Sequence, residues 1–120
     1  MKKTFQSEDL MVVLDGISDA VVKLDGKANY VAMNKAAEDT FQRLGKDPRS
    51  MIGKSVWEMF PEVKGTLVER NILRALEDDA SIKYEYYYSI DQRWYETQGY
   101  PSSPGVILVF RDITDRKAIS

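Results

Sequence analysis

The chain ends on an apolar run that passes directly into a charged one, and this stretch reads Gly105-Val106-Ile107-Leu108-Val109-Phe110-Arg111-Asp112-Ile113-Thr114-Asp115-Arg116-Lys117. The apolar half follows the turn-forming pair Pro104-Gly105 and predicts a buried β-strand. The charged half predicts a helix, because the Thr114 hydroxyl can accept a hydrogen bond from free N–H groups of the first turn, where Asp115 is also favoured. A strand that leads straight into a helix at the end of the chain indicates a connector to an output domain.

The segments before this stretch predict two further strands. Residues 82–90 alternate between Ile or Tyr and mostly polar side chains, and residues 93–100 continue in the same way after a turn at Asp91-Gln92. Residues 101–105 predict the next turn. Three consecutive strands joined by short turns are therefore expected in the last third of the chain.

The first third predicts a helix and a hairpin. Residues 7–16 form an amphipathic pattern, with Ser7 as the expected N-cap. Its apolar positions are Leu10, Val13, Leu14 and Ile17. Residues 19–25 and 28–33 alternate as strands around a tight turn at Asp25-Gly26.

The middle of the chain predicts helices. Asn34 is the expected N-cap of a helix that runs to Leu44, followed by a polar loop over residues 46–50. One helical turn is expected over residues 55–60, ended by Pro61, and a longer helix over residues 66–78. Helices inserted between the second and third strands of an antiparallel sheet make an α+β domain.

Composition excludes several classes of function. The length of 120 residues suits one domain, and a net charge of −2 gives no surface for nucleic acid. No apolar stretch reaches the roughly 20 residues that cross a bilayer, so we expect no direct membrane insertion and a cytoplasmic location.

The absence of two residue types limits the chemistry further. The chain has no histidine and no cysteine. This excludes haem ligated by histidine and flavin linked to cysteine, and we expect no metal site. The sequence does not identify a cofactor, and it is compatible with a small noncovalent ligand.

Several motifs occur in a particular order along nearly the whole chain, residues 8–117. They are Asp19-Ala20-Val21-Val22-Lys23-Leu24-Asp25-Gly26, Tyr30-Val31-Ala32-Met33-Asn34-Lys35-Ala36-Ala37-Glu38, Ile52-Gly53-Lys54-Ser55-Val56-Trp57-Glu58-Met59-Phe60-Pro61, Arg93-Trp94-Tyr95-Glu96 and Asp112-Ile113-Thr114. In order and spacing they resemble PAS domains, the sensor modules of bacterial signalling proteins such as sensor histidine kinases. The connection over residues 43–51 is a few residues longer than is usual in that family.

The resemblance implies the fold and the division of the chain. The PAS fold is α+β, with a five-stranded antiparallel sheet in the order 2-1-5-4-3 and helices inserted between strands 2 and 3. Residues 1–18 would form an N-terminal flanking helix, residues 19–114 the PAS domain, and residues 115–120 the start of a C-terminal signalling linker.

The resemblance also implies a pocket between the inner sheet face and the central helices. The candidate ligand-binding residues are Val22, Leu24, Phe41, Trp57, Ile72, Tyr84, Tyr95, Thr97, Leu108 and Phe110. Such a mostly apolar cavity with a few polar groups suits a small organic molecule. The alternative is a core that large side chains fill completely.

We expect functional roles for two further groups of residues, one in surface contacts and one in signal transmission. Trp94 and Tyr100 are expected on the outer sheet face, where Leu10, Val13, Leu14 and Ile17 would cover them within one chain or across a homodimer. Asp112, Thr114 and Arg116 are expected to transmit the signal, with Asp112 paired to Arg116.

The expected function is a non-catalytic sensory module of a multidomain signal-transduction protein, such as a sensor histidine kinase or a cyclic-dinucleotide enzyme. It would bind a small ligand, dimerise, or both, and pass the signal to a C-terminal output domain. The alternatives are a ligand-free dimerisation module and a small enzyme that uses Asp19, Glu58 or Glu85 with Tyr84 as acid.

Overall fold

The structure is a computed structural model, and it describes residues 18–119. Its elements are the strands β1 (Ala20–Leu24), β2 (Tyr30–Met33), β3 (Ile82–Tyr88), β4 (Arg93–Ser102) and β5 (Gly105–Asp112), the helices α2 (Lys35–Arg43), α3 (Pro48–Met51), α4 (Val56–Met59), α5 (Leu67–Asp78) and α6 (Thr114–Ile119), and the 3₁₀-helix η1 (Pro61–Val63).

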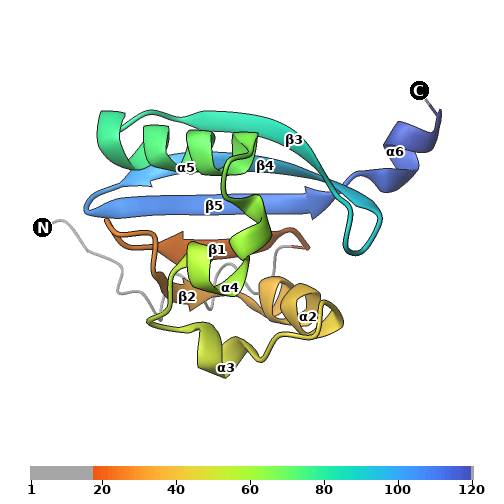
Figure 1. Ribbon diagram of the computed structural model, residues 1–120, viewed down its shortest axis with the longest axis horizontal. Helices are drawn as coiled ribbons and strands as arrows, with labels where there is room; N and C mark the ends of the chain where they lie inside the picture. The colour runs from red at the N-terminus through yellow and green to blue at the C-terminus, as the bar shows by residue number, and fades with distance from the viewer. Residues whose placement is uncertain (1–17, 120) are drawn as a thin grey trace, which may run out of the picture.

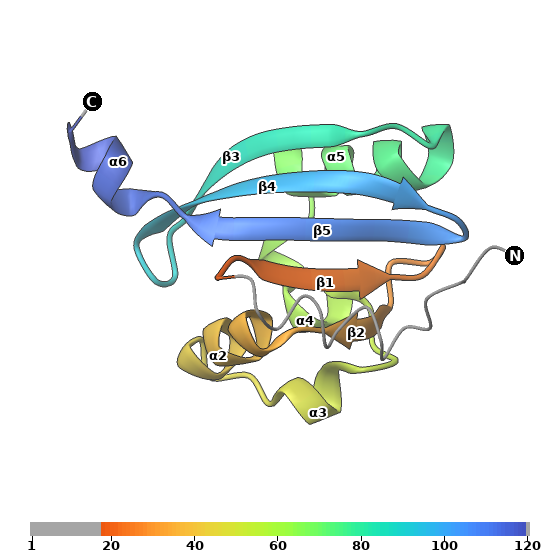
Figure 2. The same ribbon diagram turned by 180° about the vertical axis from the view of Figure 1, so that it is seen from behind.

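The five strands form one antiparallel sheet in the order β2-β1-β5-β4-β3, which confirms the predicted order. Helices α2, α4 and α5 lie on one face of this sheet, and α6 leaves the sheet at the end of β5 (Figures 1 and 2). The α+β fold is therefore as predicted. The face toward α2, α4 and α5 is called the inner face below, and the opposite one the outer face.

The core lies between the inner face and the helices. Alternate residues of β1 point inward, and Val22 and Leu24 are almost completely buried together with Val106 of β5. Helix α5 covers them with Ile72 and Ala75, on the apolar face that its sequence pattern predicts.

Asn34 fixes the junction between the hairpin and α2. Its buried side-chain oxygen accepts hydrogen bonds from the backbone N–H groups of Val21 (2.9 Å) and Ala37 (3.0 Å). Its amide nitrogen donates to the carbonyl of Asp19 at 3.0 Å. The predicted N-cap is confirmed, and the same side chain also ties α2 to the start of β1.

Gly105 allows β5 to begin directly against the end of β1. A Cβ atom at this position would lie 1.8 Å from the carbonyl oxygen of Leu24, which no side chain tolerates. The turn before β5 therefore requires glycine here.

Three segments differ from the prediction. Residues 46–50 were expected as a loop, but α3 begins at Pro48, where the side chain of Asp47 caps the helix by accepting from the N–H of Arg49. Helix α4 ends at Met59, before Pro61, as predicted, but the separate 3₁₀-helix η1 that starts on Pro61 was not predicted. Strand β4 runs through Pro101 to Ser102, where a turn at 101–105 was expected, because its pairing with β5 extends to Ser102 and Gly105.

The helix predicted over residues 7–16, with Leu10, Val13, Leu14 and Ile17, lies outside the described residues and stays a prediction. Within residues 18–119, every helix is too short or too polar to cross a bilayer.

Candidate functional site

A cavity of two adjoining chambers lies between the inner sheet face and the helices. The first chamber has a volume of about 130 Å³ and the second about 120 Å³. The residues common to both walls are Phe41, Phe60, Val63, Val68, Tyr84, Thr97 and Phe110. The two chambers share much of their wall and therefore lie next to each other between the same elements.

The structure brings most of the predicted pocket residues together. Phe41, Tyr84, Thr97 and Phe110 line both chambers, and Tyr95 lines the first. The second chamber adds Val22, Ile72 and Leu108 to its wall.

Leu24 and Trp57 line neither chamber. Leu24 is fully buried and pairs with Tyr30 and Val106, so it fills the closed core at the far end of β1. Trp57 is partly buried against the core from α4.

Sequence reasoning missed part of the wall. Tyr86 and Tyr88 line the first chamber and Tyr30 lines the second. The period of two along β3 was a usable signal, because it places Tyr86 and Tyr88 on the same face as Tyr84. The apolar stripe of the helix predicted over residues 66–78 likewise places Val68 one turn before Ile72. Nothing comparable in the sequence pointed to Val63, whose place depends on how η1 packs.

The polar groups of the shared wall are hydroxyls. Tyr84 and Thr97 are cross-strand neighbours on β3 and β4. Burial raises the pKa of Tyr84 to about 12, although a hydrogen bond with Thr97 acts in the opposite direction. The Tyr84 phenol is therefore uncharged at neutral pH.

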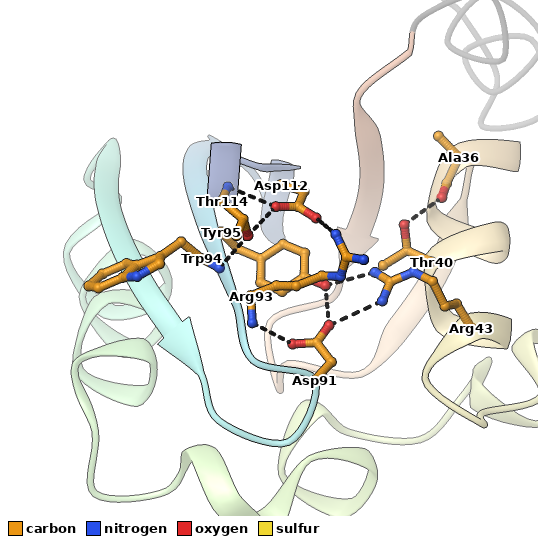
Figure 3. A network of polar contacts seen from close by, with 9 residues as sticks. All are labelled: Ala36, Thr40, Arg43, Asp91, Arg93, Trp94, Tyr95, Asp112 and Thr114. Carbon is orange, nitrogen blue, oxygen red and sulfur yellow. Dashed lines mark hydrogen bonds and ion pairs between the residues drawn. The ribbon is translucent and has the colours of Figure 1, made fainter. Parts of the chain in front are cut away.

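Tyr95 connects the first chamber to the β3–β4 turn and to α2 (Figure 3). Its hydroxyl donates to the carboxylate of Asp91 and accepts a hydrogen bond of 2.8 Å from Arg43. Arg43 also forms an ion pair of 3.3 Å with Asp91. Burial, followed by the Asp91 carboxylate, raises the pKa of Tyr95 to about 12.

Asp112 anchors the start of α6 (Figure 3). Its carboxylate accepts hydrogen bonds from the backbone N–H (2.9 Å) and the hydroxyl (2.6 Å) of Thr114, and it pairs with Arg93 at 2.7 Å. Partial burial alone would raise the pKa of Asp112, but the hydrogen bonds from Thr114 and Arg93 outweigh it and bring this pKa below its usual value.

These contacts correct two expectations. Asp112 pairs with Arg93, where Arg116 was predicted, because both lie at the same end of neighbouring strands. The Thr114 hydroxyl accepts its hydrogen bond of 2.9 Å from the N–H of Trp94 on β4, and it is the Asp112 carboxylate that accepts from the first N–H of α6.

Arg116 connects α6, which projects beyond the end of the sheet, to carboxylates on the outer face (Figures 1 and 2). It forms ion pairs with Glu85 on β3 and, at 3.5 Å, with Glu96 on β4. Lys117 adds an ion pair of 2.6 Å to Glu85, and its hydrogen bond to this carboxylate is the main reason why the pKa of Glu85 is lowered. Glu96, whose side chain is 7% exposed, also pairs with Arg111 at 3.0 Å.

The outer face carries aromatic side chains, as predicted from Trp94 and Tyr100. The Trp94 ring packs beside Tyr87, with 5.6 Å between ring centroids, and Lys117 of α6 lies 4.7 Å from its centroid. Tyr87 and Tyr100 are exposed, at 43% and 47%.

The carboxylates of the enzyme alternative are not brought together. Tyr84 and Glu85 point to opposite faces of β3, and Glu58 caps α4 by accepting from the N–H of Ser55. Within residues 18–119, no three acidic side chains gather as a metal site would require.

The fold and the cavity can now be compared with known proteins. The family model described as "PAS fold" matches residues 14–118, nearly all of the chain. The chain belongs to the PAS family. It is a PAS sensory domain, and no curated protein matches it significantly.

Solved PAS structures share this architecture. A sensory box sensor histidine kinase from Vibrio cholerae is 26% identical, with a TM-score of 0.64 over 88% of this chain and 90% of that one. The PAS domain of Bordetella pertussis BvgS is 21% identical, with a TM-score of 0.66 over 93% of this chain and 89% of that one. The PAS domain of the Cronobacter turicensis quorum-sensing receptor RpfR, solved in complex with BDSF, is 22% identical, with a TM-score of 0.65 over 81% and 95%.

Proposed function

We propose that this PAS domain is a non-catalytic, cytoplasmic sensory module of a signalling protein, in which a small ligand occupies the two chambers and changes the position of α6. The helix would pass that change to a C-terminal output domain, as in a sensor histidine kinase. In this proposal residues 19–114 form the sensing body and residues 115–120 begin the linker.

The observation that carries the proposal is the position of Tyr95. Its ring lines the first chamber, and its hydroxyl is bonded to Asp91 in the turn that precedes β4. Asp91 also accepts from the backbone N–H of Arg93, whose guanidinium pairs with Asp112 at the start of α6. A ligand that displaces the Tyr95 ring therefore acts on contacts that lead to Thr114.

The solved relatives support the two halves of this proposal. The RpfR domain is a protein of this fold that was solved with a bound molecule, and the V. cholerae protein is a sensor histidine kinase. Ligand binding by the cavity residues, and signal transmission by Asp112, Thr114 and Arg116, are what we infer for this chain from its own geometry.

A second function, homodimerisation without a ligand, is favoured by the aromatic side chains on the outer face. Tyr87 and Tyr100 are exposed large side chains, and such surfaces often form contacts between proteins. In that case the segment with Leu10, Val13, Leu14 and Ile17, together with Trp94, would form the dimer contact.

Native mass spectrometry of the gently purified domain distinguishes the two functions. The sensory proposal expects a reproducible bound mass, which is lost in Val68→Trp because the new ring fills both chambers, and retained in Tyr100→Phe on the outer face. A clean ligand-free dimer mass in the wild type would contradict ligand sensing and favour the dimerisation module.

A further inference from the structure

Within residues 18–119, the side chains that line both chambers are uncharged. The wall consists of aliphatic or aromatic side chains together with the hydroxyls of threonine and tyrosine. An ion against such a wall gives up part of its hydration and gains no counter-ion from the wall, which disfavours its binding relative to an uncharged molecule. The wall therefore favours uncharged molecules over ions of the same shape.

Charged side chains also contact the wall from outside. Arg43 pairs with Asp91 beside Tyr95, the Glu62 carboxylate accepts a 2.6 Å hydrogen bond from Tyr88, and Lys46 lies over the Phe60 ring. Among the described residues, these charged side chains carry both signs, so they do not favour an ion of one sign in the cavity.

Tyr84 and Thr97 line both chambers, and they are the residues of the shared wall that carry hydroxyls. A tyrosine and a threonine carry two O–H donors between them, and a contact between these two cross-strand neighbours can use only one of them. The other is available to an oxygen atom of a ligand. Burial raises the pKa of Tyr84 to about 12, so the phenol keeps its proton throughout the physiological range.

The size of each chamber sets the size of the groups that fit. An apolar cavity of roughly 150 Å³ holds one benzene molecule. Chambers of about 130 and 120 Å³ each suit a group of about that size or slightly smaller.

We infer that the ligand of this domain is an uncharged, largely apolar molecule with one hydrogen-bond-accepting oxygen, which binds at Tyr84 and Thr97 between the two chambers. This inference rests on the proposed sensory function and specifies the chemical class of its ligand. Carboxylates and amines of the same shape are disfavoured by the wall.

Three probes of one shape test the inference. Benzamide, benzoate and benzylammonium differ in charge and are each titrated at pH 7 against the isotope-labelled domain, with the NMR signals of cavity residues as the readout. Benzamide is expected to bind at least tenfold more tightly than either ion. Tyr84→Phe and Thr97→Val are expected to weaken benzamide binding by threefold or more, whereas Tyr87→Phe, on the outer face of the same strand, leaves it unchanged.

The outcomes separate the inference from the proposed function. If benzoate or benzylammonium shifts the cavity signals at equal or lower concentration than benzamide, the cavity binds ligands but the inference is overturned. The same holds if benzamide binds equally well to Tyr84→Phe, Thr97→Val and the wild type. If none of the probes shifts the cavity signals, the inference falls together with ligand binding as the function of the cavity.

Discussion

Glu96 and Thr97 are consecutive residues of β4, and both are buried, yet their surroundings are opposite. Glu96 faces the outer side, where Arg111 and Arg116 pair with its carboxylate. Thr97 faces the cavity, where its neighbour is the Tyr84 hydroxyl. The buried carboxylate of Glu96 thus lies on the side where two arginines pair with it, and one of them, Arg116, belongs to α6. The outer face holds the C-terminal helix by ion pairs, and the inner face keeps the cavity uncharged.

Placing a carboxylate at residue 97, next to Glu96, tests this difference between the two faces with the largest expected effect. Thr97→Glu places a carboxylate in the uncharged cavity, and we expect it to lower the free energy of unfolding by about 3 kcal/mol or more. Gln98→Glu, on the outer face, is the control and should change it by less than about 1 kcal/mol. Urea unfolding measures both variants, and a fully stable Thr97→Glu domain would show that the cavity tolerates charge.

Removing the charge from the outer face has a smaller expected effect. Glu96→Gln should cost about 1–2 kcal/mol, less than for a fully buried pair, because Arg111 and Arg116 are about half exposed and recover hydration. Glu85→Gln removes a more exposed carboxylate, whose ion pairs are screened by water, and should cost less than Glu96→Gln. The difference between the two variants in urea unfolding should shrink in 1 M salt. Equal losses of stability in Glu96→Gln and Glu85→Gln would contradict the conclusion that the buried Glu96 carboxylate contributes more to stability.

Acid tests the carboxylate contacts that anchor α6 without mutation. The pKa values of Asp112 and Glu85 lie below their ordinary values of 3.8 and 4.5. Their contribution to stability is therefore fully present above those values and is lost as the pH falls through the lower pKa values of the folded state. The NMR signals of α6 should stay constant from pH 7 to about 4.5 and change on further acidification. Loosening of α6 between pH 5 and 7 would contradict this assignment.

The resemblance to PAS domains predicted the sheet order and most of the cavity wall, and the alternation along each strand agrees with it by deciding which side chains share a face. The same alternation places Glu96 and Thr97 on opposite faces of the sheet. It did not predict the partner of Asp112, since this depends on the register that brings Arg93 to the same end of the sheet. The contacts of Arg116 with Glu85 and Glu96 also escaped sequence reasoning, because they depend on the direction in which α6 leaves β5.

The central claim is that the cavity and α6 are coupled, and amide hydrogen exchange of α6 tests it most directly. Exchange at the Lys117 amide, which bonds to the Ile113 carbonyl at 3.0 Å, is measured with the cavity empty and with it saturated by benzamide. We predict at least a threefold change on saturation and little change in α3. In Asp112→Ala, which should fold normally, exchange in α6 is faster and the response to benzamide is lost. If benzamide fills the cavity and exchange in α6 stays the same, the coupling does not exist.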